Sequence, residues 1–181
     1  MKKLLITTTI VFVVLAVLAG VAYAATGTTD PQVLRDLARV RQLTAKYHDV
    51  NVAIADGYAP APVCDALPGA GAMGYHYVNM DLMMERGVRL EAPEILLYAP
   101  SGTGVRLIGV EYFEGIGAPD MAVDQLPQPV APAPVLFKVP FDGPMNGHIP
   151  GMPPHYDLHV WIWQPNPDGI FAMWNPSATC P

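Results

Sequence analysis

Serine is almost absent from this 181-residue sequence, which contains only Ser101 and Ser177. Neither lies in a Gly-x-Ser-x-Gly segment, so serine acyl-transfer chemistry is not expected. The sequence has no Gly-x-x-x-x-Gly-Lys to bind phosphates, no Gly-x-Gly-x-x-Gly after an expected strand, and no Cys-x-x-Cys-His to attach haem. Chemistry is therefore left to histidine, carboxylate and methionine side chains.

The first residues have the pattern of an export signal. Two lysines precede an apolar run that is strongest from Ile10 to Val21, and Ala22-Tyr23-Ala24 places small residues where a signal peptidase reads them. We expect residues 1–24 to be a signal peptide cleaved after Ala24, and residues 25–181 to form one extracytoplasmic domain (secreted, periplasmic or at the cell surface). The alternative is an uncleaved membrane anchor, because Leu4 to Ala25 approaches the ~20 residues that span a bilayer.

Basic side chains are also scarce. The chain has ten Lys and Arg against sixteen Asp and Glu. Removal of Lys2 and Lys3 with the signal peptide would leave eight against sixteen, a net charge of −8. Nucleic acids and anionic membrane surfaces are bound through basic patches, so neither is expected as a partner.

The only two cysteines are Cys64 and Cys180. An even number of cysteines in an exported chain predicts a disulfide, which would close a loop of more than a hundred residues. It would hold the C-terminal tail near the start of the domain. Paired in this way, neither sulfur could act as a nucleophile.

The pattern of apolar residues predicts an α+β fold. Helical periodicity extends over residues 31–56, with Thr29 or Asp30 as the cap, so we expect one long N-terminal amphipathic helix packed on an antiparallel β-sheet. After Gly57, proline and glycine recur throughout the sequence and leave only short apolar runs between them, which predicts short strands joined by Pro/Gly-rich loops. The expected strands are Tyr75–Asn79, Glu94–Ala99, Val105–Phe113, Val135–Val139, Tyr156–Trp163 and Ile170–Trp174, the second and third forming a hairpin.

Several stretches resemble a family of small exported bacterial proteins. They are Thr44–Val50, Ala55–Tyr58, Met73-Gly74-Tyr75-His76-Tyr77, Pro93–Tyr98, Gly109–Tyr112, His155–Trp163 and Asn175-Pro176. The resemblance covers most of the chain after the signal. It implies an extracytoplasmic setting and carries no activity with it.

Three groups of side chains are candidate metal ligands. On the strand that follows Pro154, His155, Asp157 and His159 share one face with Trp161 and Trp163. At a rise of ~3.3 Å per residue, His155 and His159 would be ~13 Å apart, too far to bind one ion unless the strand starts near Asp157.

The second group is Met145, His148 and Met152, with His155 as a further member; thioether and imidazole ligands together suit copper, especially Cu(I). The third is His76 with Glu111, which would meet His159 across the sheet. Two histidines and a carboxylate suit zinc or iron. Each histidine can equally be a packing residue, and each methionine can simply fill a gap.

These observations predict an exported binding domain for a transition metal ion, copper or zinc, on the histidine face. Two other hypotheses stay open. One is a small metal-dependent enzyme with His76, Glu111 and His159 as ligands and Asp157 or Glu94 as the base. The other is a structural or assembly protein whose Trp/Pro surface contacts another copy or an unknown extracytoplasmic protein.

Overall fold

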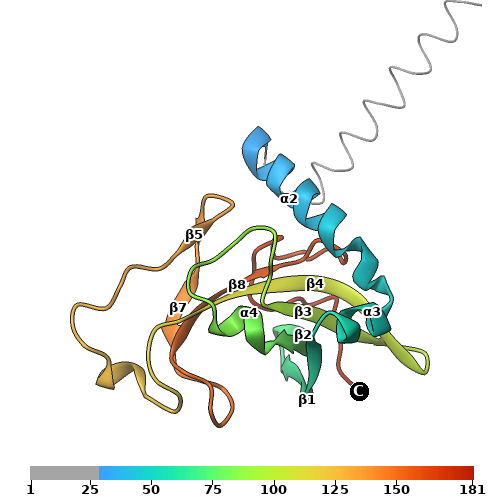
Figure 1. The fold of residues 1–181 in the computed structure, drawn as a ribbon. Helices are drawn as coiled ribbons and strands as arrows, with labels where there is room; N and C mark the ends of the chain where they lie inside the picture. The colour runs from blue at the N-terminus through green and yellow to red at the C-terminus, as the bar shows by residue number, and fades with distance from the viewer. Residues whose placement is uncertain (1–28) are drawn as a thin grey trace, which may run out of the picture.

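A six-stranded antiparallel sheet in the order β1-β2-β3-β4-β8-β7 forms the centre of the structure, a computed structural model that describes residues 29–181 (Figure 1). Its strands are Tyr58–Leu67 (β1), Gly71–Asn79 (β2), Ile95–Ser101 (β3), Gly104–Gly115 (β4), Asp142–Met145 (β7) and His155–Val160 (β8). A separate pair, Val135–Leu136 (β5) and Val139–Pro140 (β6), and two short helical segments, Met80–Met84 (α4) and Val123–Gln125 (η2), lie in the connections. The α+β class and the antiparallel sheet are as predicted.

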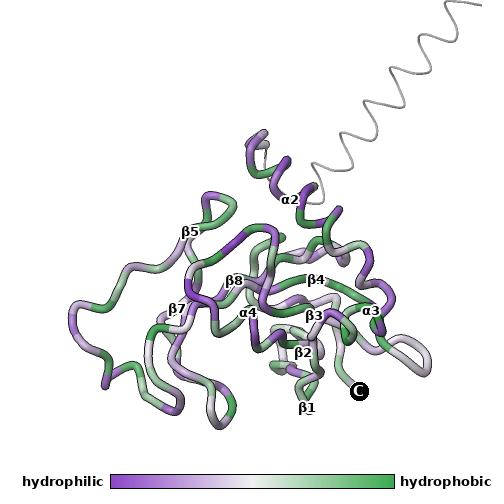
Figure 2. The backbone as a smooth tube through the Cα atoms, viewed as in Figure 1, coloured by the Kyte–Doolittle hydropathy of each residue, from purple (hydrophilic) through white to green (hydrophobic). Residues whose placement is uncertain are grey.

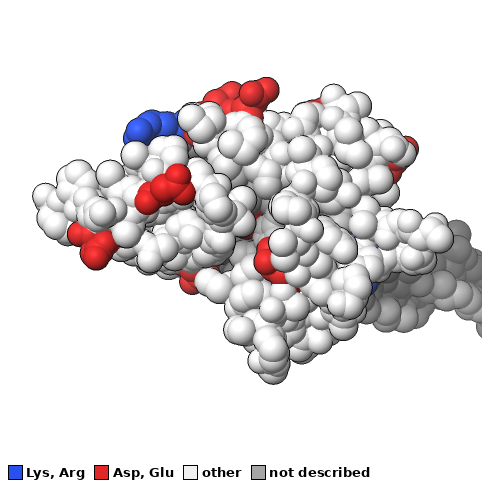
Figure 3. Space-filling model, turned by 90° about the horizontal axis from the view of Figure 1, so that it is seen from below, with Lys and Arg blue, Asp and Glu red and all other residues white. Residues whose placement is uncertain are grey.

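The expected signal peptide, residues 1–24, lies outside the described residues. No helix within residues 29–181 has the length and apolarity needed to cross a bilayer. Acidic groups are more frequent than basic groups on the face drawn in Figure 3, in keeping with the negative net charge of the sequence.

The single helix predicted over residues 31–56 is wrong. The structure has three segments instead: Pro31–Thr44 (α2), Ala45–His48 (η1) and Val50–Ala55 (α3). Asp49 breaks the helix, because its backbone is extended (φ −88°, ψ 106°) and its carboxylate accepts a hydrogen bond from Asn51 N at 3.0 Å. An aspartate that bonds nearby backbone N–H groups in this way begins a new helix rather than continuing the old one.

The predicted start of the first helix is confirmed. Asp30 caps α2 by accepting from Gln32 N at 2.9 Å and Val33 N at 3.2 Å. The apolar stripe of α2 is visible in Figure 2 as alternating hydrophobic and hydrophilic segments, and Val33, Leu37 and Val40 are buried.

Two strands of the six-stranded sheet were not predicted, and both contain proline. Pro60 and Pro62 lie in β1, and Pro144 lies in β7. These strands form the two edges of the sheet, where a residue without an N–H group is tolerated because one side of the strand has no neighbour. The rule that proline interrupts strands therefore concealed both edges.

The other strand predictions have mixed outcomes. The hairpin of β3 and β4 is confirmed, with Ser101 opposite Gly104. Residues 170–174 do not form the predicted strand; Trp161 N bonds to Ile170 O at 2.9 Å, and the segment otherwise turns. Residues 69–74 spell Gly-x-Gly-x-x-Gly after β1, but they lead into strand β2 and not into a helix, so the dinucleotide-binding geometry is missing.

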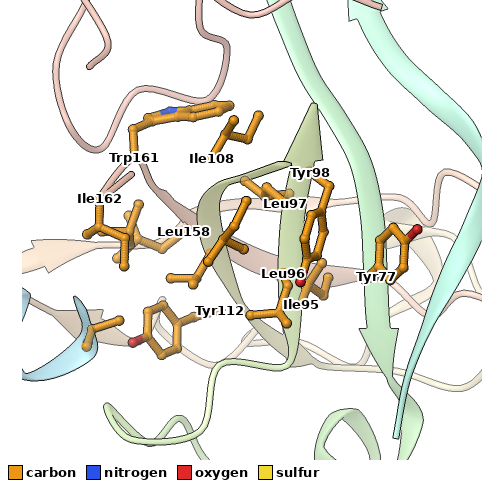
Figure 4. Packing of buried hydrophobic residues seen from close by; sticks show 14 of the residues in the cluster. Tyr77, Ile95, Leu96, Leu97, Tyr98, Ile108, Tyr112, Leu158, Trp161 and Ile162 are labelled. Carbon is orange, nitrogen blue, oxygen red and sulfur yellow. The ribbon is translucent and has the colours of Figure 1, made fainter. Parts of the chain in front are cut away.

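The sheet is buried on both faces, as all six residues of β8 show. One face packs against the N-terminal helical segments, where the Tyr98 hydroxyl donates to Tyr47 O at 2.6 Å. Leu96, Tyr112 and Leu158 are among its packed side chains (Figure 4). The other face carries polar side chains, among them His76, Glu111 and His159.

The predicted disulfide is present. Cys64 in β1 is bonded to Cys180, across 116 positions of sequence, so the C-terminal tail is joined to an edge strand. We expect the double variant Cys64→Ala/Cys180→Ala to unfold with a free energy about 2–4 kcal/mol smaller, because the unfolded chain loses its cross-link. Urea unfolding monitored by tryptophan fluorescence measures the difference. Reductant should lower the midpoint of the wild type and leave that of the variant unchanged; a reductant-insensitive wild type would contradict the expectation.

Candidate metal centre

Three strands bring His76, Glu111 and His159 together. Glu111 of β4 lies directly opposite His159 of β8 and opposite Ile95 of β3, which in turn lies opposite Val78 of β2. Residues opposite one another point to the same face of a sheet, and His76 shares that face because it lies two residues from Val78. The predicted third ligand group therefore forms.

The two imidazoles approach one carboxylate oxygen. His76 Nε2 lies 3.1 Å from Glu111 Oε2, and His159 Nε2 lies 3.6 Å from the same oxygen. One ligand atom from each of the three residues lies within 4.8 Å of the others. Among the His, Cys, Asp and Glu side chains of residues 29–181, these three are arranged so that they could hold a metal ion. We call these three residues the triad.

The second nitrogen of each imidazole faces another carboxylate. His76 Nδ1 is 3.0 Å from Asp65 Oδ2, and His159 Nδ1 is 3.9 Å from Asp157 Oδ1. Histidines that bind metals commonly direct the second ring nitrogen to a carboxylate, which fixes the tautomer and the ring orientation. Asp157, predicted as a metal ligand, lies next to the triad but is not one of its three members.

Many polar atoms of this group have no hydrogen-bond partner. The carboxyl oxygens near His159 are 3.6 and 3.9 Å from its nitrogens, beyond hydrogen-bond length, and the 3.0 Å approach of His76 Nδ1 to Asp65 does not count as a hydrogen bond. Buried polar atoms left in this state cost about 1–3 kcal/mol each, and a ligand bound among them would satisfy part of the group. The unpartnered atoms of the group are His76 Nδ1, Glu111 Oε2, Asp157 Oδ1 and both nitrogens of His159.

The electrostatics of the triad combine burial with close charges. Burial lowers the pKa of His76, but the charges of Glu111 and Asp65 outweigh it and raise that pKa to about 10. Burial raises the pKa of Glu111, but His159 and His76 bring it down to about 2. His76 is therefore protonated and Glu111 ionised at neutral pH.

The pKa values of His159 and Asp157 are shifted in the opposite directions. Burial lowers the pKa of His159 to about 4, so this imidazole is neutral. Burial, followed by the charge of Glu111, raises the pKa of Asp157 to about 8, so this carboxyl group is protonated at neutral pH. A dication would favour ionisation of Asp157 and loss of the extra proton from His76.

The second predicted group also comes together, at a separate place. Met145 of β7 lies opposite His155 of β8, and the rings of His148 and His155 are 5.1 Å apart, centroid to centroid. His148 N donates to Met152 Sδ at 3.4 Å. His155 does not reach the triad, because Asp157 lies between it and His159, as the spacing along a strand requires.

Two predicted members of the site lie elsewhere. Trp163 is not on the histidine face: β8 ends at Val160, and the Trp163 indole N–H donates to Thr44 Oγ1 at 3.1 Å on the helical side. Glu94 accepts from Phe113 N at 3.0 Å, and burial raises its pKa to about 7. Trp161 does stay near the site, stacked on His159 with ring centroids 6.2 Å apart.

One residue of the site was missed from the sequence. Asp65 belongs to β1, the edge strand that its prolines concealed, and it carries no motif that distinguishes it from other surface acids. Asp65 is opposite Gly74, which lies two residues before His76 on the same face of β2, and only this pairing places Asp65 at the site. Comparisons of the chain with protein-family models, curated proteins and solved structures found no match, so a function has to be argued from this geometry.

Proposed function

We propose that this protein is an extracytoplasmic domain that binds a divalent transition metal ion, zinc in first place, through His76 Nε2, His159 Nε2 and the Glu111 carboxylate. The observation that carries the proposal is the orientation of the imidazoles. Both Nε2 atoms point to the same carboxylate, and each Nδ1 atom faces a carboxylate of its own.

The spacing of the ligand atoms supports this ion. Zinc–ligand bonds of ~2.0–2.1 Å in tetrahedral geometry place two ligand atoms roughly 3.3 Å apart. The observed separations from Glu111 Oε2 are 3.1 Å to His76 and 3.6 Å to His159. Small side-chain shifts would centre an ion among the three atoms.

The charges around the triad support a dication. Glu111, Asp65 and Asp157 can supply three negative charges, whereas the two imidazoles become neutral when they bind metal. Zinc suits imidazole and carboxylate ligands, and the disulfide removes both thiols from consideration.

The proposed location outside the cytoplasm rests on three supports. The disulfide is typical of proteins in oxidising compartments. The sequence of residues 1–24 has the charge, apolar and small-residue pattern of an export signal, and the resemblance to exported bacterial proteins points the same way.

Zinc binding at pH 7.5 should release at least one proton per ion. The pKa of His76 is about 10 before metal binds, so its proton must leave when Nε2 becomes a ligand, and Asp157 adds a further contribution. Because the metal-free protein holds the His76 proton below pH 10, zinc affinity should rise at least about tenfold per pH unit between about pH 6.5 and 8.5.

Calorimetry in buffers of different ionisation enthalpy counts the released protons. Two imidazoles with the ordinary pKa of ~6.5 would release only about 0.2 proton at pH 7.5. A count that low would contradict the protonated His76.

A second candidate function, a metal-dependent enzyme, is favoured by the number of ligands. Three protein ligands leave one position of a tetrahedral zinc ion free, as in catalytic zinc sites. The cobalt-substituted protein tests this point: a visible spectrum that changes on addition of azide or cyanide indicates an open position, and an unresponsive spectrum indicates a binding site alone.

A further inference from the structure

A second set of potential ligands lies beyond Asp157, and the triad does not use it. We call Met145, His148, Met152 and His155 the outer group. Asp157 separates the two sets: its Oδ1 is 3.9 Å from His159 Nδ1, and its Oδ2 is 3.8 Å from His155 Nε2.

His155 is held as a ligand would be. Its residue is 0% exposed, and its ring stacks on Phe113 with centroids 4.7 Å apart. Its Nδ1 lies 3.0 Å from Pro153 O, which can only accept a hydrogen bond, so Nδ1 carries the proton and Nε2 presents its lone pair. That Nε2 atom has no hydrogen-bond partner, which is unusual for a fully buried nitrogen.

The other members approach His155 from the surface. The His148 ring makes an edge contact with the His155 ring at 5.1 Å, and Met145 lies opposite His155 in the β7–β8 pairing. His148 and Met152 line a surface cavity of about 350 Å³, and Met121 lines the same cavity. A buried imidazole thus lies behind an exposed imidazole and the thioethers of the outer group.

We propose that the outer group is a copper(I) site, distinct from the triad, with His155 Nε2 and His148 as imidazole ligands and Met152, supported by Met145, as thioether ligand. Soft thioethers with imidazole prefer Cu(I), whereas zinc prefers the imidazole–carboxylate set of the triad. His148 is exposed and Met152 half-buried on the loop between β7 and β8, so their side chains can turn toward His155 Nε2.

Anaerobic titration with Cu(I) against a chromophoric competitor such as bicinchoninate tests the site. The wild type should bind one Cu(I) per chain. His148→Ala and Met152→Leu should each weaken that binding tenfold or more, and they should leave zinc affinity unchanged. His148 is exposed, and leucine has nearly the volume of the half-buried Met152, so these variants should fold even where a His155 variant does not.

Two matched controls exclude general effects of removing a histidine or a methionine. His48→Ala removes an exposed imidazole that contacts Trp163, and Met84→Leu removes a thioether on α4 that is 76% exposed. Both should bind Cu(I) like the wild type. X-ray absorption at the copper edge should show sulfur scattering that Met152→Leu diminishes.

The proposal is overturned if the wild type does not compete for Cu(I), or if His148→Ala and Met152→Leu bind it as the wild type does. It is also overturned if Glu111→Gln, and not the outer-group variants, abolishes Cu(I) binding, since copper would then occupy the triad. Zinc titration of the same proteins tests the triad separately. If Glu111→Gln no longer binds zinc but still binds Cu(I) as the wild type does, the result supports both sites.

Discussion

Glu111→Gln should weaken zinc binding by more than about 100-fold, since changes to residues that merely orient metal ligands already cost about 10–100-fold. The amide has nearly the shape of the carboxylate, so the packing of β4 against β8 should persist. The negative charge that faces both Nε2 atoms is lost, however, and with it the best ligand oxygen. Competition titration with a fluorescent zinc indicator measures the change.

Glu114→Gln is the matched control for this variant. Glu114 lies on the same strand, three residues further on, and accepts a hydrogen bond from Gly87 N at 3.0 Å away from the triad. Its replacement should leave zinc affinity unchanged. Asp65→Asn, which removes the carboxylate behind His76, should weaken binding about tenfold. Equal zinc affinity in Glu111→Gln and Glu114→Gln would refute the triad as the site.

Gly74→Ala should lower the free energy of unfolding by more than about 3 kcal/mol, combining a strained backbone with a steric collision. Gly74 has a φ of +92°, and a Cβ atom there would lie 2.4 Å from Tyr98 O on the neighbouring strand β3. The obstacle is backbone, which cannot move aside without opening the β2–β3 pairing. Because that pairing also places His76, zinc affinity should fall with stability.

Gly69→Ala separates the two causes. Gly69 has a similar φ of +85°, but a Cβ atom there would meet nothing within 4 Å. This variant should therefore show the backbone strain alone, about 1 kcal/mol. Urea unfolding of both proteins gives the comparison. Equal losses in the two variants would mean that the collision with Tyr98 O is relieved in some other way.

The central part of the sheet could be predicted from the sequence, because β3, β4 and β8 have long β-forming runs and a clear turn between the first two. Alternation along such strands also brought His76, Glu111 and His159 to one face. The same reasoning correctly kept His155 away from His159, and the structure places Asp157 between them.

The remaining features depend on contacts that no local pattern encodes. The edge strands β1 and β7 contain prolines, which only their edge positions make acceptable. The break at Asp49 lies within an uninterrupted apolar periodicity, and Trp163 leaves the strand face because the chain turns after Val160. Asp65 could not be recognised until β1 was known to lie beside β2.

The structure relates the two candidate metal positions through one residue. Asp157 faces His159 of the triad with one oxygen and His155 of the outer group with the other. Ligand type would direct different ions to the two positions, since one offers imidazole and carboxylate and the other imidazole and thioether. Asp157→Asn is therefore the variant in which the two affinities should change together.

The most direct test of the account is X-ray absorption spectroscopy of the protein loaded with one equivalent of zinc. We expect two imidazole nitrogens and one or two oxygens at ~2.0–2.2 Å, without sulfur. In His159→Ala the same spectrum should lose one imidazole, whereas in His48→Ala it should not change. A wild type that retains no zinc, or a spectrum unaffected by His159→Ala, would contradict the proposal that the triad binds metal.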